Sequence, residues 1–201
     1  MPRLLVATTN RGKVAEYSAL LYGLDIELIT LDQAGISQEA SEEYNTFAEN
    51  ARSKAEFYSG LSGLLTIADD SGLEVDALGG EPGVRSSRYA GDNASDADRV
   101  NFLLNKLKEV PLEKRQARFK CVIAIATPDG NLHLTSGECE GAIALEPRGK
   151  NGFGYDPIFF LPQYGKTIAE IEPNLKNEIS HRGRAASKAR AVLAEIVTKK
   201  R

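Results

Sequence analysis

The feature that most constrains this fold is the first part of the chain, where a short apolar run leads through a polar loop into a helix. Leu4–Ala7 predicts a buried strand, and Val14, Tyr17 and Leu21 recur at helical spacing within Arg11–Tyr22, which predicts a helix. Strand and helix patterns continue to mix along the rest of the chain, without an internal repeat. This mixture indicates an α/β or α+β fold.

The polar loop, Ala7-Thr8-Thr9-Asn10-Arg11-Gly12-Lys13-Val14, contains the Gly-Lys pair of a P-loop. A P-loop also needs an upstream glycine and, directly after the lysine, a Ser or Thr that holds Mg²⁺. Ala7 and Val14 stand at those positions, so any metal must be held elsewhere. Two interpretations remain open: a phosphate site made by the helix start and Lys13, or an ordinary helix capped by Asn10.

Composition limits the classes of function. The chain has 201 residues, 42% of them hydrophobic, and a net charge of −3. We expect one domain over residues 1–201. No apolar run is long enough for a membrane span, and the first one is too short for a secretion signal. A duplex-binding protein would carry a basic excess. We therefore expect a cytoplasmic protein with no membrane and no nucleic-acid partner.

The two cysteines lie at nearly symmetric distances from a predicted turn at Pro128–Asn131. Cys121 and Cys139 could therefore face each other across a hairpin. A chain with two cysteines and no recognisable secretion signal is typical of a reducing compartment. We therefore expect two buried thiols and no disulfide.

Further elements are predicted by periodicity, caps and turn residues. Thr46 and Ser95 are expected helix caps, and Asp69–Gly72 is expected to end a strand. The predicted strands cover residues 26–30, 64–68, 73–78, 118–127, 132–144 and 158–161, and the predicted helices cover residues 46–59, 95–107 and 182–197.

Two acidic pairs are candidate metal ligands. Asp69-Asp70 follows an apolar strand, where adjacent carboxylates repel each other unless a cation is near. Mg²⁺ suits such hard oxygen ligands, with substrate phosphates completing its shell. The alternative is a simple Asp-Ser-Gly turn. Glu42-Glu43 could supply a second carboxylate, or it is a solvated charge run.

Candidate cations and an aromatic loop complete the set. Lys54 lies beside the apolar face of its helix, and Lys176, His181 and Arg182 cluster late in the chain, the last two at a helix start that cations disfavour. The loop Gly152–Pro157 sets an aromatic ring between two glycines, so backbone and ring could approach a nucleobase, or the ring belongs to the core. Together these features fit a nucleoside triphosphate.

The sequence resembles the inosine/xanthosine triphosphate pyrophosphatase family, which removes deaminated purine nucleotides. The matching blocks occur in the family's order over nearly the whole chain: Thr8–Lys13, Thr46–Ala51 with Lys54, Ala68–Leu73, Val75–Gly80, Ser87–Gly91, Gly152–Pro157 and Ile179–Gly183. The resemblance implies an α/β fold, with a long mixed β-sheet, flanking helices and two lobes around a central substrate cleft, usually as a homodimer.

The resemblance also implies a role for each matching residue. Asp70 and Asp69 are the expected catalytic carboxylates, and Glu42 and Asp70 the expected Mg²⁺ ligands. Residues expected to bind a purine nucleoside triphosphate are Thr8, Thr9, Asn10, Arg11, Gly12, Lys13, Lys54, Ser71, Phe153, Gly154, Tyr155, Asp156, Lys176, His181 and Arg182.

One stretch departs from the family pattern. Many members read Glu-Thr-Gly-x-Thr-Phe where this chain reads Glu42-Glu43-Tyr44-Asn45-Thr46-Phe47, so Glu43 is the alternative metal ligand. The expected reaction is hydrolysis of ITP, dITP or XTP to the monophosphate and pyrophosphate. A pyrophosphatase for modified pyrimidine nucleotides and a non-catalytic nucleotide or RNA binder are the other classes to be distinguished.

Overall fold

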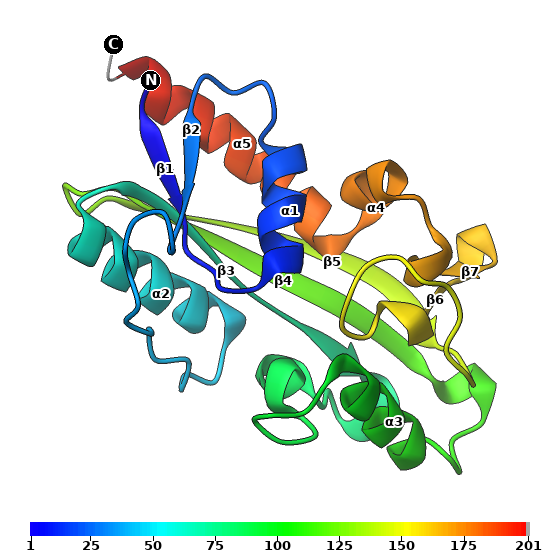
Figure 1. Ribbon diagram of the computed structural model, residues 1–201. Coiled ribbons are helices and arrows are strands. Elements are labelled where there is room, and N and C mark those ends of the chain that lie inside the picture. The colour runs from blue at the N-terminus through cyan, green and yellow to red at the C-terminus, as the bar shows by residue number, and fades with distance from the viewer. Residues whose placement is uncertain (200–201) are drawn as a thin grey trace. The chain divides into compact units, whose positions relative to one another are not determined.

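The computed structural model describes residues 1–199 and divides into two compact units. Unit 1 comprises Met1–Asp70, Cys121–Gly137 and the chain from Arg182, and unit 2 comprises Ser71–Lys120 and Glu138–His181. The strand order is β2-β1-β3-β4-β5-β6-β7. The β2-β1 and β1-β3 pairs are parallel, whereas β5-β6 and β6-β7 are antiparallel, so the sheet is mixed (Figure 1).

Unit 1 has a three-layered core around its parallel strands β1 (Arg3–Val6), β2 (Glu27–Thr30) and the first part of β3 (Leu65–Val75). Leu4 and Val6 pack with apolar residues of helices α1 (Arg11–Leu20) and α5 (His181–Lys199). Leu5 and Ala7 pack instead with helix α2 (Phe47–Ser62). Alternate residues thus pack into two separate apolar clusters, because successive side chains of a strand point to opposite faces of the sheet.

Unit 2 has a single large apolar cluster. It joins helix α3 (Asp96–Lys106) to the later half of β3, the first half of β4 (Gln116–Ala126) and the later half of β5 (Leu132–Ile143). The short strands β6 (Phe159–Leu161) and β7 (Lys166–Thr167) and helix α4 (Pro173–Ile179) complete the unit.

The prediction that a strand ends at Asp69–Gly72 is wrong, and the alternative of a simple Asp-Ser-Gly turn there is wrong too. β3 runs without interruption from Leu65 to Val75 through both aspartates, Ser71 and Gly72. The residues before and after the acidic pair are almost all buried, so ladder pairing and burial outweigh the turn preference of Asp, Ser and Gly. Asp69 and Asp70 therefore lie inside a buried strand.

The fold class is otherwise as predicted: a mixed sheet with flanking helices. Asn10, Thr46 and Ser95 are the caps of α1, α2 and α3, and their side chains accept hydrogen bonds from backbone N–H groups. Element ends differ by a few residues, and α4 was not predicted because it is a single short helix opened by Pro173. The cleft between lobes and the single domain stay predictions.

Cys121 and Cys139 are both buried and not joined in a disulfide, as expected. Within residues 1–199, none of the helices is long and apolar enough to cross a membrane.

Candidate functional site

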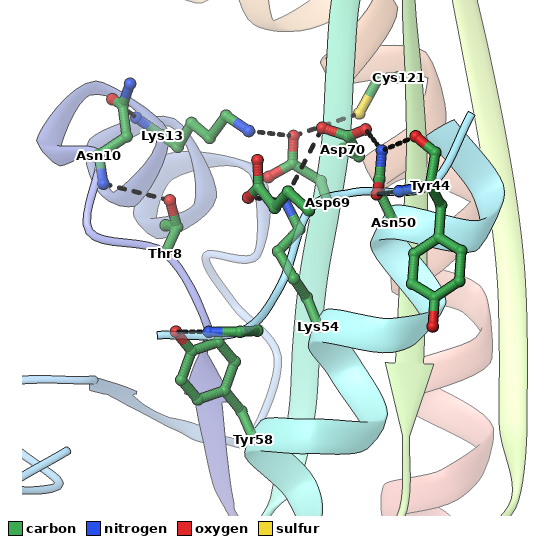
Figure 2. Close-up of polar contacts among 12 residues, drawn as sticks. Thr8, Asn10, Lys13, Tyr44, Asn50, Lys54, Tyr58, Asp69, Asp70 and Cys121 are labelled. Carbon is green, nitrogen blue, oxygen red and sulfur yellow. Dashed lines mark hydrogen bonds and ion pairs between the residues drawn. The ribbon is translucent and has the colours of Figure 1, made fainter. Parts of the chain in front are cut away.

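The acidic pair of β3 is split between two environments because successive side chains of a strand point to opposite faces. Asp69 meets residues of α1 and α5, and Asp70 meets residues of α2. Figure 2 shows the two sets of contacts, with Lys13 joined to Asp69 and Asn50 joined to Asp70. The two carboxylates thus have different partners although they are neighbours in sequence.

Asp69 lies at the centre of a buried ionic chain in unit 1. Its Oδ2 lies 3.0 Å from Lys13 Nζ and 3.2 Å from Arg182 Nη2, and Arg182 Nη1 donates to Glu16 Oε2 at 2.6 Å. Burial by itself raises the pKa of Asp69, but Lys13 and Arg182 lower it more strongly, to well below the usual range. Asp69 is therefore an anion at neutral pH and ties α1 and α5 to β3.

The phosphate-loop candidate is built on the start of α1. Asn10 Oδ1 accepts from the Lys13 N–H at 3.1 Å, and Thr8 Oγ1 accepts from the Asn10 N–H at 3.2 Å. Thr9 and Arg11 are exposed, and Gly12 is half-buried. Asn10 is thus the cap that one interpretation expected, while the ammonium of Lys13 faces Asp69 rather than bulk water.

Asp70 faces α2 and has a different electrostatic setting. Its Oδ2 accepts from Asn50 Nδ2 at 3.0 Å, and its Oδ1 lies 3.8 Å from Lys54 Nζ. Burial raises the pKa of Asp70, and Lys54 and Lys13 offset only part of that rise. A carboxylate whose charged form is disfavoured binds a proton more readily than an ordinary aspartate does.

Lys54 brings a second carboxylate into this group. Its Nζ donates to Glu42 Oε1 at 2.8 Å, so Glu42 and Asp70 converge on one ammonium. Burial lowers the pKa of Lys54, but Asp70 and Glu42 outweigh burial and the net shift is upward. Lys54 therefore stays charged although its side chain is buried.

The donor set around Lys54 fits a divalent cation that is bound by few protein ligands. Two carboxylates that share one cationic partner are hard oxygen donors, and Mg²⁺ commonly takes one or two carboxylates plus substrate phosphates. Within residues 1–199 there is no group of three or more His, Cys, Asp and Glu side chains that could hold a metal without such help. Glu43 is exposed.

Sequence reasoning missed Glu16, the partner of Arg182. Cations disfavour a helix start, yet His181 and Arg182 begin α5. In the structure Glu16 and Asp69 supply two carboxylates to the Arg182 guanidinium, which is 2% exposed. Glu16 is one of many charged helix residues, and its bond to Arg182 spans 166 residues. No motif signals such a pair.

The aromatic loop of unit 2 is tightly held. Asp156 Oδ2 accepts from the Phe153 N–H at 2.9 Å and from Lys176 Nζ at 2.7 Å. The Lys176 ammonium lies 4.8 Å from the centre of the Phe153 ring. The hydroxyl of buried Tyr155 donates to the Ser86 carbonyl at 3.0 Å. Phe153 is half-buried, so it is not a core residue.

The remaining candidates also lie in unit 2. His181 is buried, and its ring stacks on Phe119 with centroids 4.6 Å apart. Ser71 is half-buried in β3 directly after Asp70. The structure thus gathers the predicted residues into two groups, each within one unit: Lys13, Glu42, Lys54, Asp69, Asp70 and Arg182 in unit 1, and Phe153, Asp156 and Lys176 in unit 2.

The sequence matches one family model and several known proteins that share one name. The sequence model of the Ham1 family matches residues 4–192. The chain is 47% identical to a dITP/XTP pyrophosphatase of Desulforamulus reducens over 194 residues, which is 96% of each chain. It is 49% identical to a dITP/XTP pyrophosphatase of Geobacter sulfurreducens over 185 residues, 92% of this chain and 93% of the relative.

Solved structures agree with these sequence matches. A HAM1 protein from Coxiella burnetii is 44% identical, with a TM-score of 0.88 over 97% of this chain and 100% of that one. A nucleoside-triphosphatase, dITP/XTP pyrophosphatase, from Mycobacterium abscessus is 41% identical, with a TM-score of 0.75 over 93% of this chain and 98% of that one.

Proposed function

The chain belongs to the Ham1 family, and from this membership we infer that it is a dITP/XTP pyrophosphatase. It hydrolyses deaminated purine nucleoside triphosphates, namely ITP, dITP and XTP, to the nucleoside monophosphate and pyrophosphate, which keeps them out of DNA and RNA. The observation that carries this inference is the identity of 47% and 49% to two dITP/XTP pyrophosphatases over nearly the whole chain.

We propose that Asp70 is the proton acceptor of this reaction. Water attacks the α-phosphorus, its proton passes to Asp70, and the bond between the α-phosphorus and the bridging oxygen breaks to release pyrophosphate. The position of Asp70 supports this role, because Asn50 Nδ2 holds its Oδ2 at 3.0 Å and the Lys54 ammonium lies 3.8 Å from its Oδ1, so the carboxylate is oriented beside a cation that can stabilise the phosphates. The lowered pKa of Asp69 suits a fixed anion that holds Lys13 and does not exchange a proton.

We further propose that Glu42 and Asp70 hold Mg²⁺. When bound, the ion neutralises charge on the phosphates. The chain's own cations, Lys13 and Lys54, stabilise the same charge, and the start of α1 adds backbone N–H groups. The convergence of Glu42 and Asp70 on Lys54 supports Glu42, and not the exposed Glu43, as the second ligand.

For the base we propose the loop of unit 2. The Phe153 ring stacks on the purine, and Gly154, Tyr155, Asp156 and His181 shape the pocket together with Ser71. Hypoxanthine and xanthine carry a keto group and an N1–H where adenine carries an amino group. A site whose buried donors pair with the keto group leaves those donors unpaired when adenine binds. This loss lowers kcat/KM for the adenine nucleotide by orders of magnitude.

The remaining proposed contacts concern the other cations and the assembly. We propose that Thr8, Thr9, Asn10, Arg11 and Gly12 contact the triphosphate and that Lys176 and Arg182 contribute charge. A homodimer in the cytoplasm is the proposed working state. Family resemblance supports it, and sedimentation analysis of the purified protein tests it by mass.

Asp70→Asn tests the proposed mechanism. We expect turnover of ITP to fall by about a hundredfold or more, the contribution of a general base. Stability should change little, because the burial that raises the pKa of Asp70 also makes the uncharged amide acceptable there. Pyrophosphate release and thermal unfolding are measured on Asp70→Asn and on Asp32→Asn, an exposed site with the same charge change. Near-normal turnover of Asp70→Asn contradicts the assignment.

A further inference from the structure

The aromatic loop of unit 2 is held by two carboxylates that accept from successive backbone N–H groups. The Phe153 N–H donates to Asp156 Oδ2 at 2.9 Å, and the Gly154 N–H donates to Asp96 Oδ2 at 2.7 Å. Asp156 belongs to the loop itself. Asp96, by contrast, lies 58 residues away in sequence, on the first turn of α3. The loop conformation therefore depends on a residue outside every matching block.

Asp96 is itself oriented by its neighbours. Its Oδ1 contacts the Nη2 atom of Arg99, one turn further along α3. Arg99 Nη1 donates to the carbonyls of Ser87 at 2.9 Å and of Ala94 at 2.6 Å. One oxygen of Asp96 is thus fixed by a guanidinium that is anchored to backbone, and the other oxygen points at Gly154.

At Gly152 the backbone of the loop lies so close to Asp156 that no side chain would fit there. A Cβ on Gly152 would lie 2.0 Å from Asp156 Oδ2, so the backbone there closes directly onto that carboxylate. The Lys176 ammonium contacts both Asp156 and the Phe153 ring. Phe153 is therefore fixed through its own N–H and its ring, and the residue after it is fixed by Asp96.

We propose that Asp96 is a positioning residue for purine binding: by accepting the Gly154 N–H it holds the Phe153 ring in the orientation that stacks on the base. This role rests on the proposed function, since it assigns Phe153 to the purine. The Asp96 side chain is 47% exposed, so its bond adds little to stability, and its main effect falls on the loop. Preorganised binding loops lose affinity when such supporting contacts are removed.

The test compares Asp96→Ala, which removes the acceptor, with Asp96→Asn, which keeps an oxygen, and with Asp92→Ala as control. Asp92 is an exposed aspartate in the preceding loop of the same unit. In Asp96→Ala we expect KM for ITP and the inhibition constant of inosine monophosphate to rise about tenfold, the size of one hydrogen bond to a charged group. The inhibition constant of pyrophosphate and kcat should stay within about twofold, because pyrophosphate lacks the base. Asp96→Asn should lie between wild type and Asp96→Ala.

Two outcomes overturn the proposal: unchanged affinity of Asp96→Ala for inosine monophosphate, or equal losses for the monophosphate and pyrophosphate. Hydrogen exchange of the Gly154 amide, followed by NMR without substrate, tests the contact independently. Faster exchange in Asp96→Ala than in Asp92→Ala is expected, and equal rates also overturn the proposal. If wild type hydrolyses no ITP, the proposed function fails, while the exchange rates still decide whether Asp96 holds the loop.

Discussion

At the scale of single residues, the main feature is the contrast between two adjacent aspartates. Asp69 is 2% exposed and Asp70 7% exposed, so burial alone does not separate them. The pKa of Asp69 is lowered because Lys13 and Arg182 both contact its Oδ2 and outweigh burial. Burial raises the pKa of Asp70, and its more distant cationic neighbour, Lys54, offsets only part of that rise. Strand geometry thus gives the two carboxylates different partners and opposite pKa shifts, which supports the proposal that Asp70 is the proton acceptor.

Asp69→Asn should strongly destabilise the protein. Removing one partner of a buried ionic cluster typically costs about 3–5 kcal/mol, because Lys13 and Arg182 both lose the carboxylate that contacts them. The native carboxyl has a lowered pKa, so its contribution is complete above the ordinary value of 3.8 and is lost as the pH falls below it.

The measurement is chemical denaturation of wild type and Asp69→Asn across pH. We expect the stability difference to be largest at neutral pH and to shrink below about pH 4. Asp32→Asn, an exposed aspartate of the same unit, should behave as wild type. A difference that is small at neutral pH, or that grows on acidification, contradicts the ionic role of Asp69.

At the scale of elements, local signals located most helices and strands but failed at β3 and at long-range contacts. Asn10, Thr46 and Ser95 could be identified as caps because capping depends on neighbours within one turn. Asp69–Gly72 carries turn residues, yet pairing with other strands decides its conformation. Glu16 and Asp96 were missed for the same reason: their partners lie 166 and 58 residues away.

The close approach of two segments at Gly149 gives a prediction at this scale. Gly149 has φ +87°, and a Cβ there would lie 2.2 Å from the carbonyl carbon of Ala169. Gly149→Ala should lower the free energy of unfolding by about 2–5 kcal/mol, which combines backbone strain with overpacking. Gly165→Ala has φ +62° and open space around the Cβ, so it should cost only about 1–2 kcal/mol. Equal losses in denaturation experiments contradict the steric account.

At the scale of the whole molecule, the sequence was sufficient for the fold class and for the chemical class of substrate. The blocks around Lys13, Lys54, Asp70 and Phe153 carry side chains whose types already indicate phosphate, metal and base. The structure adds how these groups are held: two ionic clusters in unit 1, one on each face of β3, and a braced loop in unit 2. These supports depend on tertiary contacts, which sequence periodicity does not encode.

The central claim is selective hydrolysis of deaminated purine triphosphates, and a substrate panel tests it most directly. Pyrophosphate and inorganic phosphate are measured separately for ITP, XTP, GTP, ATP and dUTP, with Mg²⁺ and with a chelator. We predict pyrophosphate release from ITP and XTP that requires Mg²⁺, at a kcat/KM about a hundredfold or more above that of ATP and GTP. Comparable turnover of ATP, GTP and ITP contradicts the account, and so does a preference for dUTP or the absence of pyrophosphate release.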